Sequence, residues 1–595
     1  MTPVDWYIVV AYFILSAAVG LAFARRAGRS PSDYFLSGRS LPWWLAGTSM
    51  VATTFAADTP LAVTGMVATN GIAGNWLWWN LVMSGMLTVF FYARLWRRAE
   101  VTTDVEFAEI RYSGRPAALL RGFRAVYLAL PINLIIMGWV NLAMLKILDV
   151  TLGIEPVAAF LFLFVLTMSY SALSGLWGVV VTDFIQFTIA MIGSIVLAVY
   201  AVNAVGGMDV LLARLPEHYG SREAALSFVP ETGAGWMPVT AFLAYLGVQW
   251  WASSYPGAEP GGGGYVAQRI FSARTERDGV LATLWFNIAM YAVRPWPWIL
   301  TALAVVVLYP GIPDPADGYL RAVVDFLPPG LTGLLLAAFA AAYMSTISTQ
   351  LNWGASYLIN DLYLRFIRPD AEPRHAVRLS RIATGLLFLL SAGVTWWLNR
   401  AGSIEGAWRI IIALGAGTGL VYILRWYWWR INAWSEIAAM AVAFATFSAL
   451  TLGGVFDPVD PLESTYLMLV TTVITTVAWV AVTYLTPATD TGTLQSFYRR
   501  VRPGGPGWRT VRQSIGLPDE PIAGGALAWT NWVAGVVSVY ATLFGVGRLI
   551  LGPWPHAIAY LVVAVLSFAW IARSLSREPR EGAPAGGMPV ASAAP

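Results

Sequence analysis

The chain has 595 residues, of which 57% are hydrophobic and only 12% are charged. A soluble globular domain carries about 25% charged residues, so this composition excludes an ordinary soluble protein. The net charge of +4 comes without any basic stripe, which argues against a nucleic-acid partner, and the lack of cysteine excludes disulfides, thiolate metal sites and cysteine nucleophiles.

Apolar stretches long enough to cross a bilayer recur along the whole sequence, which predicts an all-α, polytopic membrane protein in the cell (inner or plasma) membrane. The first 26 residues are not a cleaved signal peptide, because their arginines follow the apolar run instead of preceding it. We expect about fifteen spanning helices, at residues 5–24, 41–68, 74–96, 121–147, 155–174, 176–205, 238–257, 279–309, 326–358, 379–399, 404–425, 432–453, 464–486, 527–551 and 555–574.

Every second loop between these helices is rich in arginine, and the loops between them are acidic or neutral. By the positive-inside rule, this alternation places the N-terminus outside and the C-terminus inside. The arginine-rich loops read ARRAGRS, ARLWRRAE with RYSGRPAALLRGFR, QRIFSARTERD, RFIRPDAEPRHAVRLSR, RWYWWR and YRRVRPGGPGWRTVR.

Only two segments outside the predicted helices are of any size, 206–237 outside and 487–526 inside. Both are too short for a catalytic domain, and the C-terminal tail after residue 579 has the composition of a disordered segment. The chain has three histidines and no nucleophile–base pair. We therefore expect a protein that is not an enzyme, surrounded by membrane lipid and without an obligate protein partner.

Two aspartates fall at predicted membrane depth, Asp58 in the second helix and Asp183 near the start of the sixth. A carboxylate at the centre of a spanning helix costs about 2.5–3.5 kcal/mol on insertion scales, so each marks a candidate functional site. The alternatives are that Asp58 is bonded to nearby threonines and that Asp183 lies at the headgroups. Pro60 predicts a helix break beside Asp58, and freed carbonyls there are ligands for a hard cation.

A polar cluster interrupts the apolar helix 326–358, where residues 341–352 read AAYMSTISTQLN. On a helix, Ser345, Ser348, Thr349 and Asn352 share one face. Small hydroxyl residues in membrane helices usually serve close packing. Together with two intramembrane aspartates, however, four hydroxyls within five residues favour a site for an alkali cation, which takes oxygen ligands.

Further unusual side chains are candidates for contact with a solute. Arg294 lies in the middle of a long helix that Pro295 and Pro297 are expected to kink. It either pairs with a carboxylate or with carbonyls at the kink, or it binds an anionic group of the solute. Tryptophans flank the expected central cavity and are suited to stacking on a sugar ring or a cation, namely Trp78, Trp79, Trp250 and Trp251.

The motifs YSALSGLWGVVVTDFIQ and AAYMSTISTQLN, supported by SDYFLSGRSLPWW and GGYVAQRIFSARTERD, resemble the sodium:solute symporter family, which includes sodium/proline and sodium/glucose cotransporters. The resemblance covers residues 1–430 well. It implies a leucine-transporter-type fold of five plus five helices, preceded by one helix and followed by about four. The segments are then a leading helix and loop 1–40, a first inverted repeat 41–205, an extracellular loop 206–237, a second inverted repeat 238–430 and peripheral helices 431–595.

The resemblance also implies ligands for sodium, one ion or two. A first site takes the carbonyls of Ala56, Thr59 and Ala342 and the hydroxyls of Ser345 and Thr346. A second site, present in some members, matches Asp183, Ser345, Ser348 and Thr349. Asp58 matches an aspartate of proline-type members, which have a serine where this chain has Pro60.

The function expected on this basis is sodium-coupled symport of a small organic solute by alternating access. The solute site is expected at breaks near 57–60 and 250–261. Asp58 and Arg294 favour a zwitterion such as an amino acid slightly over a sugar, for which the tryptophans and Asn352 are suited. Proton-coupled symport through Asp58, or a sensor or channel on the same scaffold, are the alternatives.

Overall fold

The computed structural model describes residues 1–27, 31–401, 404–522 and 524–577. Within them the chain is helical from end to end, and its only β-type pairings are two isolated bridges, Leu41 with Ala273 and Ser253 with Ala416. This confirms the all-α class. The tail predicted to be disordered lies outside the described residues.

The longer helices, in chain order, each correspond to one of the predicted ranges or to part of one. In the first half they are α1 (Pro3–Ala27), α3 (Trp43–Thr54), α4 (Asp58–Asn70), α6 (Val82–Leu87), α7 (Ala93–Ala99), α9 (Gly114–Tyr127), α10 (Asn133–Leu152), α11 (Pro156–Val205), α15 (Val239–Ala244), α16 (Trp250–Ala252) and α17 (Gly264–Ser272). In the second half they are α18 (Glu276–Ile288), α19 (Pro295–Leu308), α20 (Pro315–Phe326), α21 (Leu331–Ser356), α22 (Pro373–Ala401), α23 (Ile404–Leu414), α24 (Gly419–Leu424), α25 (Ala433–Leu452), α26 (Pro461–Leu485), α29 (Gly525–Leu551) and α30 (Trp554–Ser576).

Eleven helices in the described residues are long and apolar enough to cross a membrane, and the bent pair α3–α4 makes twelve. The sequence predicted fifteen. The difference arises where the chain is interrupted: the pieces α15–α16 and α23–α24 are each too short alone, and helix assignment is continuous through both predicted helices 155–174 and 176–205. Each of the fifteen predicted ranges nevertheless contains helix.

Three interruptions in apolar helices define the centre of the molecule. The α3–α4 pair bends by 60° over three non-helical residues that begin at Phe55. Residues 253–263 separate α16 from α17, and residues 415–418 separate α23 from α24. The break predicted near Pro60 lies just before it, because Pro60 sits in the first turn of α4, where a missing N–H costs no helical hydrogen bond.

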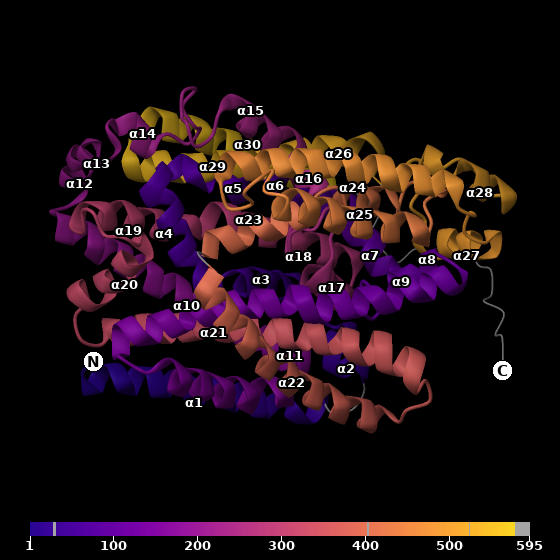
Figure 1. Cartoon of the computed structure of the whole chain (residues 1–595), viewed down its shortest axis with the longest axis horizontal. Helices are drawn as coiled ribbons and strands as arrows, with labels where there is room; N and C mark the ends of the chain where they lie inside the picture. The colour runs from indigo at the N-terminus through magenta and orange to yellow at the C-terminus, as the bar shows by residue number, and fades with distance from the viewer. Residues whose placement is uncertain (28–30, 402–403, 523, 578–595) are drawn as a thin grey trace.

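Most helices run along the long axis of the molecule (Figure 1). The helices α1 and α22 lie along one edge of this view, and α26, α29 and α30 lie along the opposite edge. Between them, α11 packs against α21, α1, α19 and α3, and α21 also contacts α3 and α10. The polar cluster of α21 is therefore buried at the centre of the bundle.

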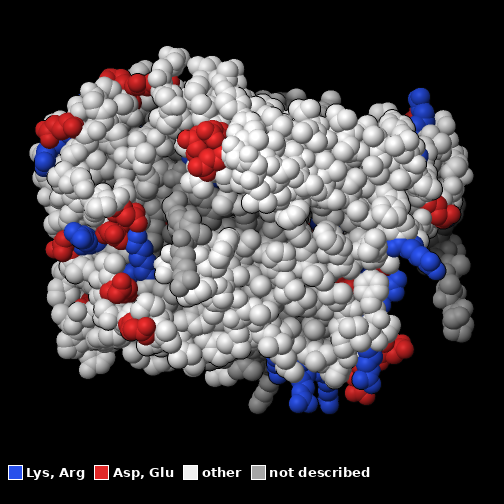
Figure 2. Space-filling view, in the orientation of Figure 1, with Lys and Arg blue, Asp and Glu red and all other residues white. Residues whose placement is uncertain are grey.

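Charged side chains on the face shown in Figure 2 gather toward the two ends of the long axis, and a broad uncharged region separates them. Lysine and arginine are most frequent near the end that holds α27 (Thr491–Val501) and α28 (Arg509–Ser514). This distribution fits a bilayer around the middle of the molecule, since apolar side chains are stable in lipid and charged ones are not.

Close packing of α3 on α18 depends on Gly47, whose added Cβ would lie 2.5 Å from the carbonyl oxygen of Ala282. We expect Gly47→Ala to lower the free energy of unfolding by about 1–3 kcal/mol, because backbone atoms have to move apart. The matched control is Gly393→Ala, also on a helix, where an added Cβ meets nothing within 4 Å. Thermal denaturation of both variants in detergent tests this. Equal melting temperatures would contradict it.

Candidate functional site

A cavity of about 70 Å³ lies between the α3–α4 break and α21. It is lined mainly by polar and aromatic side chains, which is unusual for the inside of a membrane bundle. The lining residues are Thr53, Thr54, Ala56, Asp58, Thr59, Trp78, Leu81, Ile136, Trp139, Val140, Tyr255, Pro256, Tyr265, Met290, Arg294, Thr346, Gln350 and Trp408.

The hydroxyl of Thr346 joins α21 to the broken helix. It donates to the carbonyl oxygen of Thr53 at 2.8 Å and to that of Ala342, one turn back on its own helix, at 3.2 Å. At the break, the carbonyl oxygen of Ala56 accepts from the N–H of Thr59 at 3.2 Å. Carbonyl and hydroxyl oxygens of two different helices thus converge at one edge of the cavity, as an alkali-cation site requires.

The first predicted sodium set is only partly gathered here. Ala56, Thr59 and Thr346 line the cavity. Ser345 instead donates its hydroxyl hydrogen to Asp183 Oδ1 at 2.6 Å and so belongs to a neighbouring cluster. Thr53, which the sequence reasoning did not select, takes part through its carbonyl.

The neighbouring cluster contains three of the four residues predicted for a second site. Asp183 is completely buried and accepts hydrogen bonds from Ser345 and, at 2.5 Å, from Ser49 of α3. The hydroxyls of Thr349 and Thr53 lie 3.0 Å apart. Ser348 turns back to the carbonyl oxygen of Ser345 at 3.1 Å. Asp183 therefore lies inside the bundle and not at the headgroups.

A guanidinium group completes this cluster. Arg269 on α17 is fully buried, donates from Nη2 to Thr349 Oγ1 at 2.7 Å and from Nε to Ser49 Oγ at 3.1 Å, and has Nη2 3.8 Å from Asp183 Oδ2. The sequence analysis assigned Arg269 to an arginine-rich loop, which is wrong: the helix that follows the unwound segment carries it into the core. A positive charge already compensates Asp183 where the second sodium was predicted.

The cavity also holds two charges of opposite sign that are not paired with each other. Asp58, the first residue of α4, is buried, and its Oδ1 has no hydrogen-bond partner among the described residues, threonines included. Arg294 donates to the carbonyl oxygen of Met290 at 3.1 Å, a contact expected at the kink, and to Thr54 Oγ1 at 3.0 Å. Its guanidinium lies over Trp78 and Trp298, 5.8 and 5.3 Å from the ring centroids.

Of the four tryptophans proposed for solute contact, only Trp78 lines the cavity. Trp79 is fully buried against Trp76 and Phe544, and the rings of Trp250 and Trp532 lie 5.6 Å apart. Trp251 donates to the carbonyl oxygen of Gly247 at 2.6 Å on its own helix. Asn352 accepts from Gln268 at 2.9 Å. These residues are structural neighbours of the cavity and not part of its wall.

Several lining residues escaped the sequence reasoning. Trp139, Trp408, Tyr255 and Tyr265 stand among many other aromatic residues, and nothing in their local pattern distinguishes them. Gln350 was part of the quoted polar stretch, and its Oε1 is buried without a hydrogen-bond partner among the described residues.

A family model described as "Sodium:solute symporter family" matches residues 34–443, more than half of the chain. The chain belongs to the sodium:solute symporter family. It is 24% identical over 470 residues to a sodium/glucose cotransporter of Vibrio parahaemolyticus, covering 75% of this chain and 84% of that protein. It is also 24% identical over 480 residues to a sodium/sialic acid symporter of Proteus mirabilis, covering 76% of this chain and 90% of the relative.

The fold is shared with a solved structure of a Na⁺-coupled sialic acid symporter, described as a substrate-bound outward-open state. The TM-score is 0.67 at 19% identity, over 82% of this chain and 99% of that one. The relatives are named for glucose, mannose, myo-inositol and sialic acid. The slight preference for an amino acid therefore finds no support in these names.

Removing one partner of the buried Asp183–Arg269 cluster should be costly, because the other charge is left uncompensated. We expect Arg269→Gln to lower the free energy of unfolding by about 3–5 kcal/mol, and the double variant with Asp183→Asn to recover part of the loss. Thermal denaturation of the single and double variants measures this coupling. The control is Arg509→Gln, whose side chain is 64% exposed. Additive losses would contradict the coupling.

Proposed function

We propose that this protein uses a sodium gradient to drive a small organic solute across the membrane by alternating access. The observation that carries the proposal is the junction of the α3–α4 break with the hydroxyl of Thr346, at the edge of a cavity that holds Asp58 and Arg294. Membership of the family and its sodium cotransporter relatives support sodium as the coupling ion.

Sodium couples to the solute by holding two helices together. The carbonyl oxygens of Ala56, Thr59 and Ala342 and the hydroxyls of Ser345 and Thr346 are the proposed ligands, and they belong to the α3–α4 pair and to α21. An ion bound between them stabilises the conformation in which the cavity is formed. When one helix moves relative to the other, the ligands separate and the ion leaves.

The free energy available from this coupling is modest. One sodium ion that moves down a tenfold gradient and about 100 mV supplies about 3.7 kcal/mol, enough for roughly 500-fold accumulation of a neutral solute. A second ion would square that ratio. The position of Arg269 favours a stoichiometry of one, because a resident cation already sits beside Asp183.

The solute that suits the cavity is small and carries complementary polar groups. A cavity of about 70 Å³ has room for several waters, and so for a small solute that displaces them. A carboxylate facing Arg294 and an ammonium or hydroxyl facing Asp58 would satisfy both buried charges. An amino acid meets both conditions, and a small polyol or sugar meets the second, with Trp78, Trp139 and Trp408 as an aromatic wall.

If Thr346 holds sodium, Thr346→Ala should raise the sodium concentration for half-maximal stabilisation or uptake about tenfold, because one oxygen ligand is lost. Thr346→Ser keeps the hydroxyl and should stay near the parent value. Sodium titrations of melting temperature, with potassium at constant ionic strength as the reference, measure the effect. An unchanged half-maximal concentration in the alanine variant would remove Thr346 from the site.

The number of sodium ions can be read from the Hill coefficient of sodium-driven uptake into proteoliposomes. With one coupled ion, we expect a coefficient near one that Asp183→Asn leaves unchanged. A coefficient near two that falls to one in Asp183→Asn would show instead that the second predicted set also binds sodium.

The solute class is tested by thermal-shift screening of the purified protein with amino acids, sugars, organic acids and quaternary amines, each with and without sodium. We expect a sodium-dependent shift with at least one class. Arg294→Gln should abolish the shift for a carboxylate-bearing solute and spare the shift for a neutral sugar. If no compound gives a sodium-dependent shift, sodium-coupled symport itself is contradicted.

A further inference from the structure

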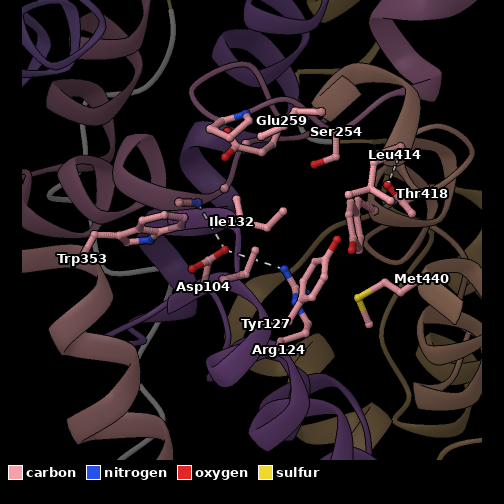
Figure 3. A pocket seen from close by; sticks show the side chains of 18 of the residues that line it. Asp104, Arg124, Tyr127, Ile132, Ser254, Glu259, Trp353, Leu414, Thr418 and Met440 are labelled. Carbon is pink, nitrogen blue, oxygen red and sulfur yellow. Dashed lines mark hydrogen bonds and ion pairs between the residues drawn. The ribbon is translucent and has the colours of Figure 1, made fainter. Parts of the chain in front are cut away.

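A second cavity, of about 80 Å³, lies beyond the unwound segment 253–263 (Figure 3). Pro256 lines both cavities, so only this segment separates the second cavity from the central one. Its lining residues are Asp104, Arg124, Tyr127, Leu128, Ile132, Ser254, Pro256, Glu259, Gly262, Gly263, Gly264, Trp353, Ile411, Leu414, Gly415, Thr418, Tyr422, Arg425 and Met440.

Most charges around this cavity already have partners. Asp104 accepts from the N–H of Gly264 at 3.2 Å and from the hydroxyl of Tyr357, and its Oδ2 lies 3.7 Å from Arg124 Nη2. Arg124 and Arg425 share Glu436, with shortest nitrogen–oxygen distances of 3.0 and 3.2 Å. These groups form one compensated network that fixes the wall.

Glu259 is the exception. Its Oε2 accepts the N–H of Gly257 at 3.0 Å, within the same unwound segment. Among the described residues, no basic side chain lies within ion-pair distance of its carboxylate, although Glu259 is half-buried and lines the cavity. A carboxylate inside a membrane protein is costly without a positive partner. The cavity therefore has one negative charge that the protein itself does not compensate.

We propose that this cavity is a second binding site, which takes a small organic monocation with Glu259 as its counter-ion. The inference rests on the proposed function in one respect: the cation is the ammonium group of a solute that passes the unwound segment. The walls favour an organic cation over a metal ion. Tyr127, Trp353 and Tyr422 offer ring faces, whereas sodium requires a shell of several oxygen ligands.

The chain has no cysteine, so a single introduced thiol can report on the field inside the cavity. Ser254 lines the cavity, and Ser254→Cys changes one atom. We expect a trimethylammonium-ethyl methanethiosulfonate reagent to modify this thiol faster than the anionic sulfonatoethyl reagent, after both rates are normalised to a free thiol in water. Glu259→Gln should lower this normalised ratio about tenfold, because the attracting charge is lost. Glu259→Asp keeps the charge and should retain most of the preference.

Two controls separate this effect from altered folding or surface charge. Glu217→Gln, at an exposed carboxylate with a side chain 61% exposed, should leave the ratio of the Ser254→Cys thiol unchanged. A thiol introduced instead by Thr530→Cys, on the exposed start of α29, should show the same ratio with and without Glu259→Gln. A ratio at position 254 that does not respond to Glu259→Gln would overturn the proposal.

Protection experiments test the occupant. Choline should slow modification of the Ser254→Cys thiol, and its neutral isostere 3,3-dimethylbutan-1-ol should not. Protection by choline should disappear in Glu259→Gln and persist in Asp58→Asn, which changes only the central cavity. Equal protection by the alcohol, protection by sodium but not choline, or loss of choline protection in Asp58→Asn but not in Glu259→Gln would each overturn the assignment.

These measurements use no sodium gradient and no uptake. They can therefore succeed when the sodium-dependent thermal shifts fail, and fail when those shifts succeed. The second site and sodium coupling are thereby tested separately.

Discussion

The structure depends on one constraint, that backbone and side-chain polar groups inside a bilayer must find partners within the protein. The α3–α4 break frees carbonyls at the centre of the bundle, and the hydroxyl of Thr346 on α21 meets one of them at 2.8 Å. The same three-residue interruption places Asp58 at the start of α4, facing a cavity. A break that would be prohibitive against lipid is stable here because α21 brings its polar cluster to it.

Charge is distributed around this centre in two distinct ways. In the cluster of Asp183, Arg269, Ser49 and Thr349, acid and base are compensated and hydrogen-bonded, which makes the cluster a fixed support between α3, α11, α17 and α21. In the central cavity, Asp58 and Arg294 line one space without forming an ion pair. Compensated charges hold helices together, and uncompensated ones retain the capacity to bind an incoming ligand.

The unwound segment 253–263 places a second uncompensated acid, Glu259, on its other side. Two cavities of similar size, adjoining at Pro256, thus form successive positions along the centre of the molecule. A solute with a positive group would meet a carboxylate in each. Binding in steps avoids the full cost of moving a charge through an apolar barrier without a partner.

The sequence by itself determined the all-α membrane class, the approximate position of every long helix, the break beside Pro60 and the buried polar stretch at 341–352. These follow from hydropathy, proline geometry and the cost of polar groups in lipid, all of which act locally along the chain. Local pattern also singled out Asp58, Asp183 and Arg294 as unusual.

Only the tertiary structure decided which of these groups meet. It brought Arg269 from an apparent loop to Asp183, turned Ser345 away from the central cavity, and placed Trp78 in its wall while Trp79 packs in the core. Asp183 and Ser345 are 162 positions apart, and Arg269 and Thr349 are 80 apart. Contacts at such separations arise from how broken helices pack, and helical periodicity within one segment carries no information about them.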